Sequence, residues 1–477
     1  MDTNRILIAG GGIAGLAAAY YAAKSAPQGT TITLLEAGPA WGGKIVTDRE
    51  SGFVIEGGPD TFIVTKPWAV NLCRALGIAD RLQGTNPETK KTYILKKGAL
   101  HELPGGLTMM IPTEIGEMVR TGLLSWPEKA RMGLDFLLPP KNGTGDESLG
   151  AFVTRRLGRG AYESLIEPLM SGIYAGDGDH LSLAATFPYL RDLEKKHGGL
   201  VRGALAARRE RAKGGGPAAP GSRSLFLTPL TGLTELVEAL VGALEQMDVD
   251  LRLEAPVVEI DRHDSWRLTL EDGQMFESEA LILATPAFVS SDLLKGYAPL
   301  LAEELRAIEY VSTATVSLAY REAGLPRPLD GYGYVIPRRE GRAALACTWT
   351  STKFPHRAPE GCALLRVFVG RAGQEGEIPW DEAGLLEIAR EELRQTLGIS
   401  AEPLFTRTYI WENAMPQYNL GHPERLDRID AALESLPGLS LAGAGYRGIG
   451  IPDCIRSGEL AAGRAVRQIN TKETASA

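Results

Sequence analysis

The first 35 residues follow a strand, helix, strand pattern of hydrophobic positions. Residues 5–9 form a short apolar run that three glycines at 10–12 interrupt, and residues 13–24 are rich in alanine and apolar throughout. A second short apolar run follows at 31–35. Strand, helix and strand fit within about 35 residues, which predicts a buried βαβ unit at the start of the chain.

The rest of the chain alternates between helical and β-type patterns. Residues 106–140 carry the broad apolar faces of helices, and residues 205–223 change abruptly to Arg, Lys, Gly and Pro, which is typical of a solvated loop or helix end. Polar and apolar positions alternate over 251–284, which predicts a small antiparallel sheet. Residues 311–370 are also β-rich, and residues 381–397 are helical.

Length, charge and cysteine usage narrow the class of protein. A chain of 477 residues is too long for one ordinary core, so two or three domains are expected. The net charge of −8 argues against nucleic acid as a partner. The four cysteines stand far apart without a Cys-x-x-Cys, as free thiols of a reducing compartment do. No apolar run reaches the ~18 residues of a spanning helix, and no signal peptide precedes the first strand. We expect a cytoplasmic protein without a transmembrane segment.

The glycines after the first strand form a dinucleotide-binding motif. Gly10-x-Gly12-x-x-Gly15 allows a sharp turn, a close approach of the backbone to a pyrophosphate, and close packing of helix on sheet. The N–H groups at the start of the following helix suit phosphate oxygens. Glu36 ends the second strand about 20 residues further on, where an acid accepts the ribose hydroxyls. A dinucleotide site is therefore predicted at this turn.

Two further segments favour FAD over NAD. A double glycine, Gly42-Gly43, follows Glu36 and lets the backbone run along the flavin side of the cofactor. Near the other end, Gly443-x-Gly445-x-x-Gly448 imitates a second dinucleotide motif, but too little chain follows it for another nucleotide half. We interpret it as a glycine-rich turn that aims a C-terminal helix at the flavin.

These segments, with several longer motifs, resemble the flavin amine oxidase and protoporphyrinogen oxidase superfamily over essentially the whole chain. Residues 36–43, residues 52–60 and the ending GAGYRGIGIPDCIRSGELAA carry the general resemblance. The motifs ATP (284–286), GYGYVIP (331–337), FPHRAP (354–359) and MPQYNLGH (415–422) are similar to its porphyrinogen oxidase branch. Glu167-Pro168 with GIYAGD (172–177) resembles the branch of Gram-positive-type bacteria, whose members act on coproporphyrinogen.

The resemblance implies the residues that contact the cofactor. They are Gly10, Gly11, Gly12, Ile13, Ala14, Gly15, Glu36, Ala37, Gly43, Lys44, Gly58, Pro59, Asp60, Thr61, Val257, Trp411, Ile449, Gly450 and Ile451. For Val257 the alternative is a plain valine in a β-strand core, and for Trp411 it is a core tryptophan.

The resemblance also implies substrate contacts. Tyr332, Gly333 and Val335 are expected beside a flat macrocycle, Gly333 because it puts no side chain where the ring plane passes, with Ile173 opposite. Lys66 is the candidate cation for the propionates, although it could instead be a solvated lysine. Some eukaryotic members place an arginine where this chain has Thr92, so Lys90 or Lys91 could take that role.

The resemblance implies an amine-oxidase-like α/β fold of mixed α+β character. An FAD-binding Rossmann-like domain is expected from residues 1–87, 226–286 and 431–477, and a mixed-sheet substrate domain from 88–105 and 287–430. Residues 106–225 would be a helical insert that lines a substrate tunnel.

The expected reaction is the FAD-dependent six-electron oxidation of a porphyrinogen, most of all coproporphyrinogen III to coproporphyrin III in haem biosynthesis, with molecular oxygen as acceptor and release of hydrogen peroxide. The flavin N5 accepts hydride, so no catalytic side chain is expected. The six histidines lack metal-ligand spacing, so no metal site is expected either. The alternatives are a protoporphyrinogen IX oxidase, an amine oxidase with an aromatic cage, and a non-catalytic FAD protein that contacts a membrane surface through residues 106–140.

Overall fold

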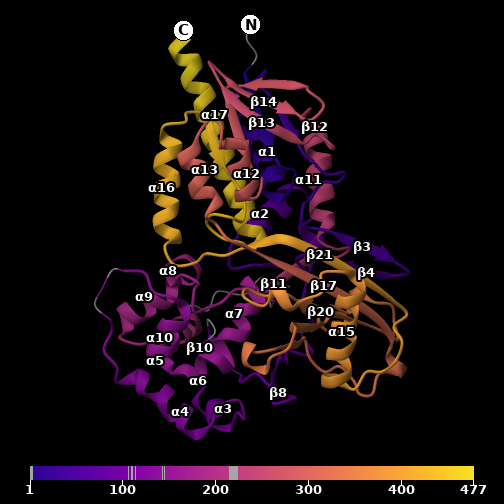
Figure 1. Ribbon diagram of the computed structural model, residues 1–477. Coiled ribbons are helices and arrows are strands. Elements are labelled where there is room, and N and C mark those ends of the chain that lie inside the picture. Colours follow the sequence, from indigo (N-terminus) through magenta and orange to yellow (C-terminus); the bar gives the residue numbers. More distant parts are fainter. Residues whose placement is uncertain are drawn as a thin grey trace.

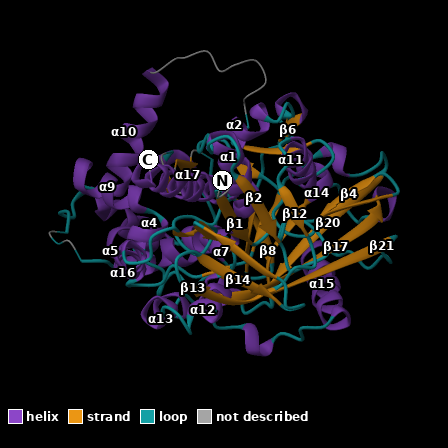
Figure 2. Ribbon diagram, turned by 90° about the horizontal axis from the view of Figure 1, so that it is seen from above, coloured by secondary structure: helices purple, strands orange, loops and turns teal. Residues whose placement is uncertain are grey.

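The structure is a computed structural model, and it describes residues 4–476 except 106, 109–110, 113, 142, 144 and 214–223. In Figure 1 a nucleotide-binding region lies at the top with both ends of the chain, a helical region lies at lower left, and a large sheet lies at lower right. Figure 2 looks down onto the same arrangement and shows most helices on one side and most strands on the other.

A parallel five-stranded sheet forms the nucleotide-binding region. Its strands run in the order β12-β2-β1-β16-β22, and every neighbouring pair is parallel. Their bounds are β1 (Arg5–Ala9), β2 (Thr31–Leu35), β12 (Asp250–Arg252), β16 (Ala280–Leu283) and β22 (Leu439–Leu441). The sheet thus draws on three separated parts of the sequence, as expected for the cofactor domain; the predicted domain boundaries themselves stay predictions.

Helix α1 (Ile13–Ser25) is apolar on all sides because other elements cover it on all sides. It packs on the sheet, on α11 (Thr234–Gln246) and on the C-terminal helix α17 (Ile451–Ser476) in one hydrophobic cluster. At the crossing with α17, a Cβ on Gly458 would stand 2.2 Å from the Ala14 carbonyl oxygen. Only a glycine at position 458 therefore allows the two helices to approach each other this closely.

A mixed seven-stranded sheet is the second layer. Its order is β21-β17-β20-β19-β18-β7-β8, antiparallel except for the parallel pair β18 and β7. The strands are β7 (Tyr93–Lys96), β8 (Ala99–Glu102), β17 (Tyr310–Arg321), β18 (Gly333–Val335), β19 (Ala344–Trp349), β20 (Cys362–Val369) and β21 (Phe405–Pro416). Helix α15 (Glu382–Leu397) packs against this sheet.

The helical region follows β8. It contains α3 (Ile115–Arg120), α4 (Trp126–Gly133), η2 (Leu134–Phe136), α5 (Leu149–Leu157), α6 (Arg159–Ala161), the π-helical turn η3 (Tyr162–Ile166), α7 (Glu167–Tyr174), α8 (Leu183–Thr186), α9 (Pro188–His197) and α10 (Leu200–Lys213). The expectation of helix throughout 106–140 was wrong at its start, where β9 (Leu107–Thr108) and β10 (Ile111–Pro112) pair. Pro112 has no N–H to donate within a helix.

The remaining elements connect these layers. The hairpin β3 (Thr47–Glu50) and β4 (Phe53–Glu56) stands beside the large sheet, and the predicted small antiparallel sheet is confirmed as β13-β14-β15. The others are β5 (Phe62–Ile63), α2 (Trp68–Ala75), η1 (Ala79–Arg81), β6 (Leu82–Gly84), β11 (Phe226–Pro229), β13 (Val257–Arg262), β14 (Trp266–Leu270), β15 (Met275–Ser278), α12 (Ala287–Leu294), α13 (Pro299–Arg306), η4 (Glu322–Gly324), η5 (Arg338–Glu340), α14 (Thr350–Lys353), η6 (Pro355–Arg357), η7 (Glu375–Glu377) and α16 (His422–Glu434). The expected α/β fold of mixed character is confirmed.

Candidate cofactor and substrate site

The glycine turn has the geometry that a pyrophosphate requires. Gly10 has a φ of +109°, and a Cβ there would lie 2.8 Å from the backbone of Ala284. A Cβ on Gly15 would stand 1.8 Å from the Gly10 oxygen, so helix and turn are in contact. Gly12 differs, because nothing lies within 4 Å of its Cβ position and no side chain caps α1 there. The first turn of α1 thus has no side-chain cap and begins beside a glycine with open space at its Cβ position, which fits a phosphate group.

The carboxylate of Glu36 lies against the same turn. Its Oε2 accepts a hydrogen bond from the Gly11 N–H at 2.6 Å, and its Oε1 accepts one from the Gly38 N–H at 2.8 Å. Each carboxylate oxygen keeps a second lone pair for a ribose hydroxyl. The Glu36 carbonyl also accepts from the N–H of Ala255, two residues before Val257, so the predicted ribose acid and β13 lie together.

Backbone contacts link the glycine turn to the segments around Gly43 and Gly58. Gly12 and Gly42 form an isolated β-bridge, and a Cβ on Gly43 would lie 3.2 Å from Gly12 Cα. Further along, a Cβ on Gly58 would stand 1.9 Å from the Lys44 oxygen. The structure thus brings the predicted cofactor residues at 10–15, 43–44 and 58 into one wall.

Two buried or half-buried polar groups near this wall are already engaged. Lys44 donates through Nζ to the Ala414 carbonyl, and burial lowers the pKa of Lys44 below its usual value. Burial raises the pKa of the Cys454 thiol to about 12, so it stays protonated at neutral pH. The protonated Cys454 thiol is therefore not suited to nucleophilic catalysis.

Side chains of the large sheet fix the segment from Gly57 to Asp60. The Gly57 oxygen accepts from the Trp411 indole N–H at 2.9 Å. Asp60 pairs with Lys353 at 2.9 Å, and the nearby cations outweigh the effect of burial on Asp60, whose pKa falls to about 2. Arg366, which sequence reasoning missed, also donates to Gly57. A lone arginine inside the apolar strand CALLRVFV (362–369) was the available signal, since charges are rarely buried without a role.

The glycine-rich C-terminal segment leads directly into α17. Gly443 and Gly448 have φ values of +124° and +126°, which favour glycine. Ile449 and Gly450 immediately precede the helix, which starts at Ile451. The segment is held from outside by Tyr418, whose hydroxyl donates to the Ala444 carbonyl at 2.6 Å and accepts from the Gly448 N–H at 2.8 Å. The motif MPQYNLGH thus has a structural role that its spacing alone did not reveal.

Of the predicted substrate residues on the large sheet, Val335 contacts the helical region. Val335 of β18 and Ile449 both pack, half-buried, against the hydrophobic cluster of the helical region. Ile173 of α7 leaves 46% of its surface exposed. The Tyr332 hydroxyl donates to the Asn86 carbonyl at 2.7 Å. Val335 and Ile449, a predicted cofactor residue, thus pack against the same hydrophobic cluster, to which neither Ile173 nor Tyr332 belongs among the residues described.

Gly333 has a different reason for being glycine than the one expected. Its φ is +130°, and a Cβ would stand 2.1 Å from the Cys347 oxygen on the neighbouring strand β19. The missing side chain would point into the sheet. Close packing of β18 on β19, and not clearance for a ring, requires the glycine.

The candidate cations for carboxylate binding have partners of their own. Lys66 Nζ donates to both oxygens of Asp453 at 2.7 Å, with 45% of its side chain exposed. Lys91 pairs with Asp330 at 2.8 Å, and Lys90 is exposed. Lys66 thus lies at the start of α17, beside the C-terminal segment, and its role toward propionates stays a prediction.

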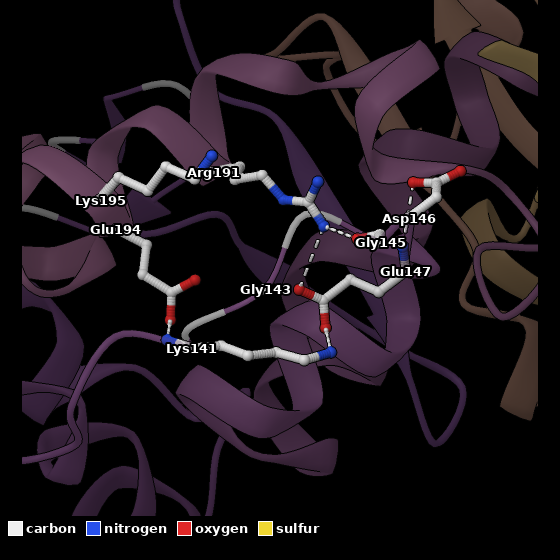
Figure 3. Close-up of a pocket in the computed structure, with 8 residues that line it drawn as sticks. All are labelled: Lys141, Gly143, Gly145, Asp146, Glu147, Arg191, Glu194 and Lys195. Carbon is white, nitrogen blue, oxygen red and sulfur yellow. Dashed lines mark hydrogen bonds and ion pairs between the residues drawn. The ribbon is translucent and has the colours of Figure 1, made fainter. Parts of the chain in front are cut away.

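A separate cavity of about 80 Å³ opens on the helical region (Figure 3). Paired charges line it: Lys141 contacts Glu147 at 3.1 Å, and Arg191 donates to the Gly145 carbonyl at 2.6 Å. A small cavity lined mostly by charged side chains does not suit a flat apolar ligand. Within the described residues, no group of three or more His, Cys, Asp or Glu is arranged to hold a metal, and no helix is long and apolar enough to cross a membrane.

Comparison with known proteins agrees with this geometry. The sequence profile of the family described as flavin containing amine oxidoreductase matches residues 13–466. Coproporphyrinogen III oxidase of Bacillus subtilis is 38% identical over 97% of this chain and 98% of its own. The Staphylococcus aureus protein of the same name is 34% identical over 98% of this chain and 100% of its own, and protoporphyrinogen oxidase of Bos taurus is 31% identical over 97% and 98%.

Solved structures give the same result. An Exiguobacterium protein, named provisionally as a protoporphyrinogen oxidase, superposes with a TM-score of 0.86 at 35% identity, covering 98% of this chain and 100% of the other. Cyclohexylamine oxidase of Brevibacterium oxydans shares the fold, with a TM-score of 0.69 at 15% identity and coverages of 98% and 100%. The chain belongs to the family of flavin-containing amine oxidoreductases, and its cofactor is FAD.

Proposed function

We propose that this protein is an FAD-dependent porphyrinogen oxidase that acts on coproporphyrinogen III. The observation that supports the proposal is that Val335 and Ile449 each pack against the apolar cluster of the helical region. A predicted substrate residue and a predicted flavin residue thus share one apolar cluster, and a flat, largely apolar macrocycle would need such an apolar lining. The names of the relatives supply the substrate class.

In this proposal the protein binds, orients and excludes water, and the bound FAD supplies the redox chemistry by accepting hydride. The Gly12 turn and Glu36 hold the nucleotide half. The segment at 57–61 and the start of α17 flank the flavin half. The helical region covers the site with its buried apolar cluster, which keeps bulk water from the reacting carbon. Molecular oxygen is the proposed acceptor, with release of hydrogen peroxide.

Coproporphyrinogen is favoured over protoporphyrinogen by the relatives. Three proteins named coproporphyrinogen III oxidase are 34–38% identical to this chain, and the plant and bovine proteins named protoporphyrinogen oxidase are 27–31% identical. The Exiguobacterium protein, which carries that name only provisionally, is 35% identical. Coproporphyrinogen carries four carboxylates, which need water or cations because a buried unpaired charge is costly. The exposed part of Lys66 makes it the candidate at one end of the site.

The test measures kcat/KM for both porphyrinogens under one set of conditions, with Lys66→Ala and, as a matched control, Lys295→Ala, which removes an exposed lysine that pairs with Asp292. We expect a clear preference for coproporphyrinogen III, a higher KM in Lys66→Ala, and little change in Lys295→Ala. A preference for protoporphyrinogen would contradict the proposed substrate but not the proposed reaction type. Anaerobic mixing with primary amines tests the rival activity, since bleaching of the flavin by an amine but not by a porphyrinogen would identify an amine oxidase.

We further propose that the protein works in the cytoplasm. All four cysteines are buried and free, as in a reducing compartment. Trp126 and Leu137 in the helical region expose 69% and 78% of their surfaces, so weak contact with a membrane surface is the alternative. Co-sedimentation with anionic vesicles at low and moderate salt decides between them; binding that persists at moderate salt and is lost in Trp126→Ser would favour the membrane surface.

A further inference from the structure

Three side chains donate hydrogen bonds to one peptide oxygen, that of Gly57. The donors are Thr315 Oγ1 at 2.9 Å, Trp411 Nε1 at 2.9 Å and Arg366 Nη2 at 3.1 Å. They come from β17, β21 and β20, which are neighbours in the large sheet. A carbonyl oxygen has two lone pairs, so a third donor is more than its geometry ordinarily accommodates. The sheet thus concentrates donors on a segment that leads into the predicted flavin contact at Gly58.

Arg366 is the unusual member of the three because it carries a full charge into the interior. Only 3% of its surface is exposed, and it also donates to the Gly58 oxygen. Its Nε is buried without a hydrogen-bond partner, and among the residues described here it forms no ion pair. The Arg366 guanidinium therefore donates its hydrogen bonds to peptide carbonyls and not to a carboxylate.

The two carboxylates nearest in sequence to Gly57 and Gly58 are taken by other cations. Glu56 pairs with Arg357 at 2.8 Å, and Asp60 pairs with Lys353 at 2.9 Å. With Arg366 the group holds three cations and two anions. A net positive charge thus remains behind Gly57 and Gly58, in a region where water screens it little.

A purely structural role would not need this charge. Thr315 and Trp411 already fix the Gly57 oxygen with neutral donors, and burying an arginine carries a desolvation cost that neutral donors avoid. Burial does lower the pKa of Arg366, while Asp60 and Glu56 oppose that effect. The charge is therefore the feature that needs a function.

We propose that Arg366 is a positioning residue for the flavin: through the Gly57 and Gly58 carbonyls it fixes the flavin-facing segment, and its charge makes the bound cofactor a stronger oxidant. The inference rests on the proposed function, because it takes Gly58 to Thr61 as that segment. Reduction adds negative charge to the ring system, and a fixed cation in a weakly screened site favours the more negative form.

The test compares midpoint potentials of holoenzymes by anaerobic equilibrium titration against a reference dye. Arg366→Gln keeps an N–H donor and removes the charge. At a fixed solution potential it should lower the ratio of reduced to oxidised flavin about tenfold, which corresponds to a midpoint potential lower by about 30 mV for a two-electron couple. Arg366→Lys keeps the charge and should stay within about threefold of the parent ratio. Thr315→Val removes one donor to the same oxygen, leaves the charge, and should not move the ratio.

Asp60→Asn should shift the midpoint potential in the opposite direction. It tests the electrostatic role of Arg366 if Arg366→Gln does not fold. It removes a negative charge from the same group, so the potential should rise. A parent-like potential in Arg366→Gln, an equal drop in Arg366→Lys or Thr315→Val, or a drop in Asp60→Asn would each overturn the electrostatic role. The measurement uses no porphyrinogen, so the inference about Arg366 can hold even if the proposed substrate is wrong. A purified protein that binds no flavin would instead contradict the proposed function itself.

Discussion

The ring of Tyr418 stacks on the ring of His422, with centroids 4.2 Å apart and planes inclined by 13°. Each ring also bonds to the glycine-rich segment before α17: the Tyr418 hydroxyl contacts Ala444 and Gly448, and His422 Nε2 contacts the Tyr446 carbonyl at 2.8 Å. One stacked pair thus holds three points of a segment whose glycines have little intrinsic preference for this conformation. We infer that the pair preorganises the segment for the cofactor.

Tyr418→Phe should weaken FAD binding without unfolding the protein. The change keeps the stack but leaves the Gly448 N–H without its acceptor, at a cost of about 1–3 kcal/mol. If that cost falls on the cofactor-binding conformation, the Kd for FAD rises about 5- to 150-fold. Titration of apoprotein with FAD, followed by flavin fluorescence, measures it.

Tyr334→Phe is the matched control. It also removes a buried tyrosine hydroxyl, which donates to Glu392 at 3.1 Å on the side of the sheet that faces α15. It should cost stability and leave the FAD affinity unchanged. Equal loss of affinity in both variants would mean that general loosening, and not the Tyr418 contacts, is responsible.

His422 gives the folded state a pH dependence on the acid side. Burial lowers its pKa below the usual value, although the Tyr446 carbonyl opposes this. Since an unfolded histidine titrates near pH ~6.5, the unfolded chain binds more protons between the folded pKa and that value. The contribution of His422 to stability is therefore complete above about pH 6.5 and is lost as the pH falls through the folded pKa.

Thermal melting of the parent and of His422→Gln at pH ~7.5 and ~5.5 measures this contribution. The parent should lose more Tm on acidification than the variant. His356, whose pKa burial lowers to about 4, contributes to both proteins equally. Parallel pH curves for the parent and His422→Gln would contradict the assignment.

The sequence predicted those parts of the site whose geometry is determined by residues close to one another in the chain. Gly10, Gly12, Gly15 and Glu36 sit within one βαβ unit, so their spacing alone fixes their geometry, and the structure places them as expected. The parallel sheet and the β-rich region were predictable for the same reason, since period-2 and apolar patterns are local.

Contacts between distant segments could not be read in this way. Arg366 reaches Gly57 across 309 positions, and Lys66 reaches Asp453 across 387. Such pairs depend on the order of strands in the large sheet and on where the first turn of α17 lies, and no local pattern determines either. The reason for Gly333 was missed likewise, because its constraint is the backbone of β19.

Gly333→Ala should destabilise the protein by several kcal/mol, because the new methyl group would collide with the Cys347 carbonyl and the φ of +130° disfavours any side chain. Gly341→Ala is the control: its φ is +65°, nothing lies within 4 Å of its Cβ position, and it should cost only ~1 kcal/mol. Denaturant unfolding of both variants measures the difference. Equal small losses, with a raised KM in Gly333→Ala alone, would restore the interpretation that the glycine clears space for the ring.

Gly12→Ala should separate cofactor binding from folding. The backbone at Gly12 has φ −69° and ψ 175°, which alanine adopts freely, and its Cβ position is empty to 4 Å. The apoprotein should therefore melt at the parent temperature. A methyl group would occupy the space that the pyrophosphate needs, and overpacking of ~1–3 kcal/mol corresponds to a 5- to 150-fold higher Kd for FAD.

Two further glycines bracket this result. Gly15→Ala would place its methyl carbon 1.8 Å from the Gly10 oxygen, so it should lower the Tm of the apoprotein itself. Gly242→Ala, in α11 with nothing within 4 Å, should keep both FAD affinity and stability or raise stability slightly. Melting of each apoprotein followed by FAD titration separates the three cases. Parent-like FAD affinity in Gly12→Ala would remove the pyrophosphate from this turn, because the open space beside Gly12 is the feature that places it there.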